Sequence, residues 1–180
     1  MSDPAVTFSI RPAATADFDA IQRVYAHHVL NGLASFEETP PDVAELTRRW
    51  RAIADAGLPY LCAVEPDGAL VGYAYAGPYR PRSAYRFSVE DSVYVAPGQA
   101  GRGVGRGLLR QLIETCTGLG KRQMIAVIGD SGNAASIALH RACGFDLTGT
   151  FRAIGFKHGR WVDSVLMQRA LGPGSSAPPP

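Results

Sequence analysis

Glycines and arginines in the middle of the chain form a pattern that could bind phosphate. They are Gly101, Arg102, Gly103, Gly105, Arg106 and Gly107. The residues from Ser88 to the break at Pro97 alternate like a strand, and those from Val104 to Leu119 repeat apolar side chains at helical spacing. Glycine lets a ligand approach the main chain, and unpaired N–H groups in the first turn of a helix attract anions. The spacing therefore predicts a strand–loop–helix that binds phosphates.

Two familiar phosphate-binding motifs fit this stretch poorly. A Walker loop ends in Gly-Lys-Ser/Thr, whereas this loop reads Gly-Val-Gly-Arg-Gly. A dinucleotide fingerprint has an acid about 20 residues further on, where this chain has Lys121 and Arg122. The loop resembles the acyl-CoA pyrophosphate loop of the GNAT acetyltransferase superfamily, Gln/Arg-x-x-Gly-x-Gly/Ala, with Gly103 and Gly105 as its glycines. The chain departs from this motif at the Gln/Arg position, which falls on Ala100, one place after a glutamine. The alternative to a phosphate-binding loop is a plain glycine-rich turn before a core helix.

Composition limits the classes of protein that this chain can belong to. Its 180 residues are 46% hydrophobic and 19% charged, as in an ordinary globular domain. A net charge of +2 argues against a protein that binds the nucleic-acid backbone. The three cysteines are scattered without a CxxC pair, which favours neither a disulfide framework nor a zinc site. With no signal-peptide pattern and no long apolar run, a cytoplasmic protein without bound metal is expected.

Hydrophobic periodicity predicts the order of the secondary-structure elements. Strands are expected at residues 6–11, 60–65 and 69–76, then in the central segment after Ser88, then at 123–128, 145–156 and 161–168. Helices are expected at residues 15–30, 42–56 and 133–142, and over the central segment that ends near Leu119. The order is that of a mixed sheet with helices on both faces.

The same order is found in the GNAT superfamily, and the resemblance covers residues 6–170. It implies an α/β (α+β) fold: one domain, residues 1–170, with a mixed, mostly antiparallel twisted sheet of about seven strands and about four helices. Residues 171–180 are rich in glycine, serine and proline, and a disordered tail is expected there.

Three separated segments narrow the resemblance to one branch of this superfamily. They are GPYRPRSAYRFSVEDSVYV, IGDSGNAASIALHRACGF and GFKHGRWVDSVLMQR, and they resemble the phosphinothricin acetyltransferases. Members of that branch acetylate phosphinothricin, methionine sulfoximine and methionine sulfone. The resemblance implies acetyl-CoA as cosubstrate, a small-molecule amine as acceptor and a homodimer.

Glu90 is the candidate general base, because it lies in the central strand just before the glycine loop. Alternation turns Ser88, Glu90 and Ser92 to one face, so the neighbouring Asp91 is expected to point away from the site. The family has its catalytic glutamate in this Val-Glu position. Glu90 could deprotonate the amine directly or through a water, and a purely structural carboxylate paired with an arginine is the alternative.

The resemblance also implies residues that bind the cosubstrate. In GNAT enzymes the central strand separates from its neighbour near its end. A main-chain N–H of Tyr94 or Val95 is therefore expected to donate a hydrogen bond to the oxyanion. The further cosubstrate-binding residues expected are Val93, Gly101, Arg102, Gly103, Val104, Gly105, Arg106, Gly107, Asn133 and Ser136.

His140 occupies the position at which many GNAT enzymes have a tyrosine, seven residues after Asn133. Its imidazolium could protonate the leaving thiolate, or the ring could only hydrogen-bond the cosubstrate. Asn133 is a candidate partner of the pantetheine arm, and its alternative role is a helix N-cap.

Acceptor selection is expected in the basic loop after the third strand. Arg80 and Arg82 carry forked donors that suit carboxylate and phosphinate oxygens, and Tyr85 adds a hydroxyl. Phe36 could wall the pocket against the aliphatic part of the acceptor. The alternatives are another acceptor (a polyamine, an aminoglycoside or a protein N-terminus) or a non-catalytic acyl-CoA sensor.

Overall fold

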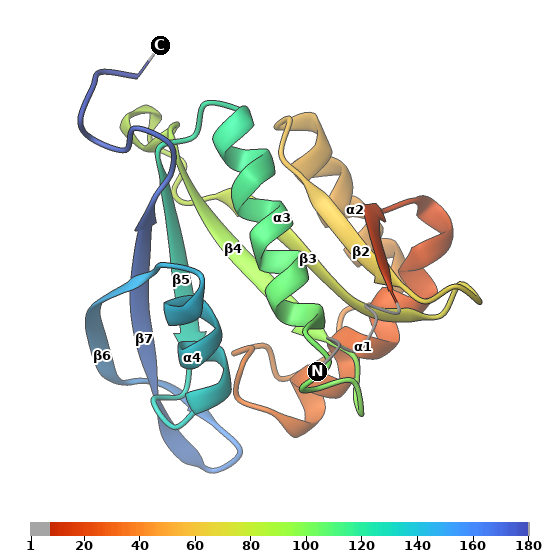
Figure 1. Ribbon diagram of the computed structural model, residues 1–180. Coiled ribbons are helices and arrows are strands. Elements are labelled where there is room, and N and C mark those ends of the chain that lie inside the picture. The colour runs from red at the N-terminus through yellow and green to blue at the C-terminus, as the bar shows by residue number, and fades with distance from the viewer. Residues whose placement is uncertain (1–7, 180) are drawn as a thin grey trace, which may run out of the picture.

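A seven-stranded twisted sheet with helices on both faces makes up the molecule (Figure 1). The computed structural model describes residues 8–179. The strands are β1 (Ser9–Pro12), β2 (Tyr60–Val64), β3 (Leu70–Pro78), β4 (Ser88–Val95), β5 (Gln123–Gly129), β6 (Asp146–Lys157) and β7 (Arg160–Ala170). The helices are α1 (Phe18–Asn31), α2 (Val43–Asp55), α3 (Val104–Gly118) and α4 (Ala134–Ala142), with short 3-10 turns at Thr15–Asp17 and Ser83–Tyr85. The predicted fold class and element order are confirmed, although Val6 lies outside the described residues.

The first helix begins three residues later than its sequence pattern predicts. Asp17 accepts a hydrogen bond from the Ala14 N–H at 2.7 Å and bonds both terminal nitrogens of Arg11, at 2.7 and 2.8 Å. These contacts close a 3-10 turn over Thr15–Asp17, and α1 then starts at Phe18.

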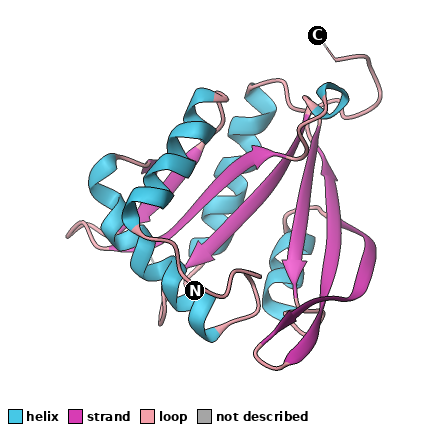
Figure 2. Ribbon diagram, turned by 180° about the vertical axis from the view of Figure 1, so that it is seen from behind, coloured by secondary structure: helices cyan, strands magenta, loops and turns pink. Residues whose placement is uncertain are grey.

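Helices cover both faces of the sheet, as Figures 1 and 2 show from opposite sides. On one face, α1 and α2 pack against β2, β3 and β4, with Phe18, Ile21 and Tyr73 fully buried between them. On the other face, α3 packs across β1 to β4 and α4 packs on β5. Leu108 and Leu112 belong to that second core. The alternation of side chains along β2 and β3 supplies both cores.

The strands run in the order β1-β2-β3-β4-β5-β7-β6, and only the β4–β5 pair is parallel. That pair is short, because its register runs from Ser88 opposite Gln123 only as far as Asp91 opposite Ala126. Beyond these residues β4 continues to Val95 and β5 to Gly129, and the two strands diverge (Figure 1). The divergence leaves main-chain groups of both strands without a partner strand in the middle of the sheet.

The C-terminal segment turns back on the sheet after β7. Leu171 is buried and Arg122 donates to the Pro178 carbonyl oxygen at 3.0 Å. Disorder of the tail stays a prediction. Within residues 8–179, no helix combines the length and the apolar character needed to cross a membrane.

Candidate active site

The loop between β4 and α3 has the backbone geometry of an anion site. Gly98, Gly101 and Gly103 have φ of 79°, 78° and 80°, a region in which side chains with a Cβ are strained. Gly103 is the N-cap of α3, and the Gly107 N–H is the first to bond back to it, at 2.9 Å. The N–H groups of the preceding turn therefore have no intrahelical partner, and they lie at the positive end of the helix dipole.

A cavity of about 670 Å³ opens at this helix N-terminus. It contains most of the predicted cosubstrate-binding residues: Val93, Tyr94, Val95, Gly101, Gly103, Val104, Gly105, Arg106, Asn133 and Ser136. Gly105 packs closely against this wall, because a Cβ there would lie 3.3 Å from the Leu139 side chain and 3.4 Å from that of Val95.

Two residues of the glycine–arginine run face elsewhere. Arg102 forms an ion pair with Glu65 at 2.7 Å and also bonds Gln99. Gly107 faces β1, because a Cβ there would lie 3.3 Å from the side chains of Phe8 and Ile10. Alternation along a glycine-rich sequence could not distinguish these positions from those that face the cavity.

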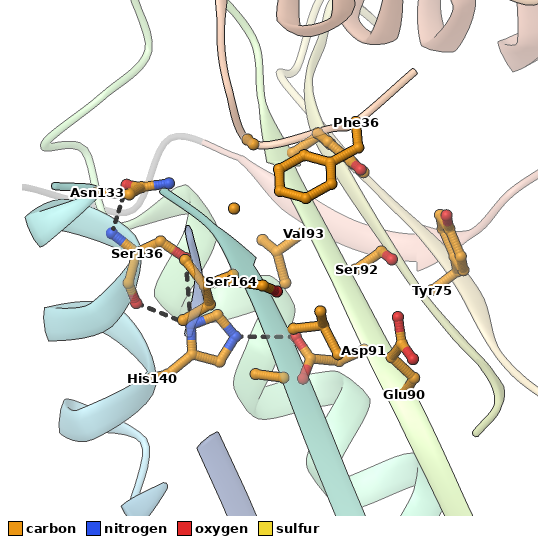
Figure 3. Close-up of a pocket in the computed structure, with 16 residues that line it drawn as sticks. Phe36, Tyr75, Glu90, Asp91, Ser92, Val93, Asn133, Ser136, His140 and Ser164 are labelled. Carbon is orange, nitrogen blue, oxygen red and sulfur yellow. Dashed lines mark hydrogen bonds and ion pairs between the residues drawn. The ribbon is translucent and has the colours of Figure 1, made fainter. Parts of the chain in front are cut away.

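A second cavity, of about 310 Å³, occupies the opening between β4 and β5 (Figure 3). Glu90, Phe36 and His140, three of the site residues proposed from the sequence, line it together with Tyr75 and Ser164, which the sequence did not single out. The two cavities adjoin, because both are lined by Ala34, Val93, Tyr94, Gly129, Asn133 and Ser136. A ligand held at the α3 N-terminus therefore has access to Glu90 through the splayed strands.

Main-chain groups of β4 alternate between the neighbouring strand and this opening. The Ala96 N–H bonds the Val71 carbonyl oxygen at 3.0 Å, in register with Tyr94 opposite Tyr73. Alternation therefore turns the Tyr94 N–H toward β3 and those of Val93 and Val95 toward the opening. Of the two expected oxyanion donors, Val95 is the one that faces the cavity.

His28, which sequence reasoning passed over, is joined to the end of β4. Its Nε2 donates to the Val95 carbonyl oxygen at 2.9 Å, and the ring lines the larger cavity. Burial lowers the pKa of His28, although its bond to this carbonyl opposes that effect, so the neutral ring is favoured. The only signal in the sequence was a histidine on the inner side of α1.

Glu90 and Asp91 both line the smaller cavity, so the expectation that Asp91 points away from the site is wrong. The cavity lies in the gap beside the strand edge, and both faces of β4 border it there. Burial and the charge of Asp91 raise the pKa of Glu90, and the charge of Arg80 opposes them. A half-buried carboxylate with a raised pKa is suited to general-base catalysis.

His140 is buried at the edge of the same cavity with both ring nitrogens engaged (Figure 3). Its Nε2 lies 2.9 Å from Asp91 Oδ2, and its Nδ1 lies 2.8 Å from the Ser136 carbonyl oxygen. Burial alone would lower the pKa of His140, but its bonds to Asp91 and Ser136 outweigh burial and raise it. Asn133 caps α4 by accepting from the Ser136 N–H at 3.2 Å.

The loop after α1 is fastened over the cavity, and it carries Phe36. The buried Lys157 donates to the Ser35 carbonyl oxygen at 2.7 Å, and the Tyr25 hydroxyl bonds the Ser35 hydroxyl at 2.9 Å. Gly155 leaves room for the Phe36 ring, because a Cβ there would lie 2.5 Å from it. Lys157 thus holds the loop on the β6–β7 hairpin.

The basic loop is not brought into the smaller cavity. Arg80, Arg82 and Tyr85 are absent from the lining of both cavities. Arg80 lies over the ring of Tyr79 at 5.2 Å and is close enough to Glu90 to affect the pKa of that carboxyl. Sequence spacing alone could not distinguish Arg80 from Arg82, since both occupy a loop without regular periodicity.

The described residues include no group of three or more metal-ligating side chains. All three cysteines, Cys62, Cys116 and Cys143, are buried, and none of them lines either cavity. Burial raises the pKa of Cys62 and of Cys116 to about 12, so their thiols stay protonated at neutral pH.

Comparison with known proteins agrees with this geometry. Residues 21–145 match the model of the acetyltransferase (GNAT) family. A phosphinothricin N-acetyltransferase of Alcaligenes faecalis is 57% identical over 95% of this chain and 86% of its own. An L-methionine sulfoximine/L-methionine sulfone acetyltransferase of Pseudomonas aeruginosa is 44% identical over 94% and 98%. A phosphinothricin acetyltransferase structure from Sinorhizobium meliloti, in complex with AcCoA, superposes with a TM-score of 0.94 at 50% identity, over 97% and 94%.

Proposed function

This chain belongs to the GNAT acetyltransferase family and is an N-acetyltransferase; from that premise we propose that it acetylates the amino group of a small amino-acid analogue with acetyl-CoA. The acceptors proposed are phosphinothricin, methionine sulfoximine and methionine sulfone. The observation that carries this proposal is the junction of two cavities at the splayed strands, with an anion site at one end and Glu90 at the other. Similarity to relatives named for those three substrates supports the acceptor class.

The residues around the larger cavity fit acetyl-CoA. Unpaired N–H groups at the start of α3 suit a pyrophosphate, and Gly103 and Gly105 keep that main chain accessible. The Val93 main-chain groups face the opening and suit the amides of the pantetheine arm, and Asn133 and Ser136 border the same path.

In the proposed reaction Glu90 takes a proton from the acceptor ammonium, directly or through a water. The amine nitrogen then forms a bond to the thioester carbonyl carbon, and the carbon–sulfur bond breaks to release the thiolate. The second proton, which the nitrogen loses as it becomes an amide nitrogen, passes to this thiolate, so the products are the N-acetylated acceptor and the free thiol of CoA. The Val95 N–H is aimed to stabilise the oxygen that becomes negative during this step. Direct transfer is supported by the absence of all three cysteines from the cavity linings.

We assign His140 a positive charge near the leaving sulfur. To give up a proton, the ring would have to break one of two buried hydrogen bonds, to Asp91 or to Ser136. A cation that stays in place stabilises a developing thiolate without giving up its own proton.

Thiol release from acetyl-CoA by the purified full chain tests this function. The amine panel contains phosphinothricin, methionine sulfone and methionine sulfoximine, with spermidine, an aminoglycoside and a lysine peptide for comparison. We expect turnover with the first three only. Turnover confined to the cationic amines would contradict the acceptor class, and acetyl-CoA binding without turnover of any amine would indicate a sensor.

Arg80→Gln is expected to raise the KM for the acceptor about tenfold or more, with little change in the KM for acetyl-CoA. Arg80 is the basic-loop residue with an electrostatic link to Glu90, and a charge-assisted bond to a carboxylate contributes about 1.5–3 kcal/mol. Arg86→Gln is the matched control, because Arg86 lies over Phe87 at 4.5 Å and bonds the Ser83 carbonyl. Steady-state kinetics with varied acceptor measures both. Equal effects of the two changes would contradict the role of Arg80.

The homodimer stays a proposal, and an apolar surface at the sheet edge supports it. Strand β6 is the last strand of the sheet, and the β6–β7 hairpin exposes Leu147, Phe151, Ile154, Phe156 and Trp161. An exposed apolar patch of this kind marks an interaction surface. We expect Trp161→Glu to shift the protein from dimer to monomer in sedimentation velocity, with Leu119→Glu, at a separate exposed leucine, as control. A wild-type monomer would contradict the proposal.

A further inference from the structure

Asp91 is one of the most deeply buried charged groups in the described part of the chain, and only one of its two carboxylate oxygens has a hydrogen-bond partner there. Its side chain is 2% exposed, and Oδ2 lies 2.9 Å from His140 Nε2. The other oxygen, Oδ1, is buried with no hydrogen-bond partner among residues 8–179. A buried carboxylate with a single partner needs that partner to be positive.

The contacts of His140 lead to the same charge state. A carbonyl oxygen can only accept, so His140 Nδ1 must donate to Ser136, at 2.8 Å. An ionised Asp91 can only accept, so beside it Nε2 donates as well. Two donating nitrogens describe an imidazolium, and the Phe145 ring, edge-on at 5.1 Å, restricts its movement.

His140 is the group that forms an ion pair with Asp91, at 2.9 Å. The other groups on which the Asp91 charge acts include Cys116 on α3 and Cys143 after α4, both thiols whose pKa is raised by burial, and Glu90 on its own strand. His140 on α4 is thus the positive group that faces it.

We propose that Asp91 is a positioning residue for acetyl transfer: its carboxylate holds His140 as a fixed imidazolium at the cavity edge, beside the cavity-lining Glu90. This inference rests on the proposed function and deepens it. Through its negative charge, Asp91 also acts on Glu90 from the opposite face of β4.

Two measurable consequences follow from this arrangement. Without the Asp91 charge, His140 keeps its Nδ1–H bond to Ser136, loses its counter-ion and becomes neutral near pH 7. Glu90 meanwhile loses a nearby like charge, so its pKa falls toward the ordinary value and it becomes a weaker base.

The test is Asp91→Asn, which keeps the shape of the side chain and removes its charge. We expect kcat to fall about 10- to 100-fold and the acid limb of the kcat/KM profile to move to lower pH. The KM for acetyl-CoA should stay within about twofold, because Asp91 does not line the larger cavity. Asp17→Asn is the matched control, since it removes a carboxylate paired with Arg11 outside both cavities, and its pH profile should be that of the wild type.

The charge of the ring is measured independently of activity, by ¹⁵N NMR of the histidine imidazoles across pH. The wild-type His140 signal is expected to be that of an imidazolium at pH 7, and the Asp91→Asn signal that of a neutral ring. A neutral wild-type ring, or a variant whose kcat and acid limb match the wild type, would overturn the inference. Wild-type protein that acetylates none of the amines would instead contradict the proposed function. The charge of His140 in the wild type is measured without any turnover, so the NMR result tests the inference even if the proposed function fails. The same wild-type titration also remains informative if the Asp91→Asn variant does not fold.

Discussion

Glu90→Gln is expected to lower kcat by about 10²- to 10⁴-fold with acetyl-CoA and a phosphinothricin-type acceptor. Glutamine fills the same half-buried position beside the smaller cavity but cannot accept the proton of the acceptor ammonium. The loss should fall on kcat more than on either KM, because the missing interaction belongs to the reaction step. Thiol release under saturating substrates measures it.

The pH dependence gives this prediction a second readout. Burial and the charge of Asp91 raise the pKa of Glu90 above 4.5, so wild-type kcat/KM should decrease as the pH falls through that raised value. The glutamine variant should lack this decrease, because it has no carboxylate to protonate.

Glu114→Gln, on the exposed side of α3, provides the control and should leave both kcat and the profile unchanged. A Glu90→Gln enzyme within threefold of wild type, with the same acid limb, would exclude Glu90 as the base.

Phe18→Ala is expected to destabilise the fold by about 3–5 kcal/mol without touching the site. Phe18 is 0% exposed between α1, α2 and the sheet, with its ring centroid 4.9 Å from Trp50 and 5.7 Å from Tyr60. For a chain of this size, such a loss corresponds to a Tm decrease of about 6–20 °C. Thermal unfolding followed by circular dichroism measures it.

Leu30→Ala is the matched control, because Leu30 lies on the same helix but is 56% exposed. It should change stability by no more than about 0.5 kcal/mol. Equal losses for the two variants would mean that the α1–α2 face of the sheet is not a packed core.

Local pattern was sufficient for much of the architecture. Periods of two and 3.6 residues depend on neighbouring residues only, so they identified the order of strands and helices before any tertiary contact was known. Gly103 at the N-terminus of α3 and Asn133 at that of α4 were likewise predictable, because capping and left-handed backbone are local properties. The place of Glu90 just before the glycine loop predicted that it would lie near this turn, and Glu90 lines the smaller cavity.

The tertiary structure decided which side chains meet. Asp91 and His140 are 49 positions apart, and alternation predicted that Asp91 points away from the site. Because β4 diverges from β5, the edge of β4 becomes a wall of the smaller cavity. The alternation of side chains within a single strand cannot predict where two strands separate. The same long-range packing joins His28 to Val95 and Lys157 to Ser35.

Local spacing in the sequence determined the order of elements and the glycine turn before α3, and the resemblance of its motifs to those of known acetyltransferases indicated the family. Tertiary structure alone decided that Arg80 lies close enough to Glu90 to act on its pKa, that the N–H of Val95 rather than that of Tyr94 faces the opening, and that His140 has a buried counter-ion. Each of these depends on how strands far apart in the chain pair or separate, and the free energy of such contacts is not encoded in the spacing of neighbouring residues.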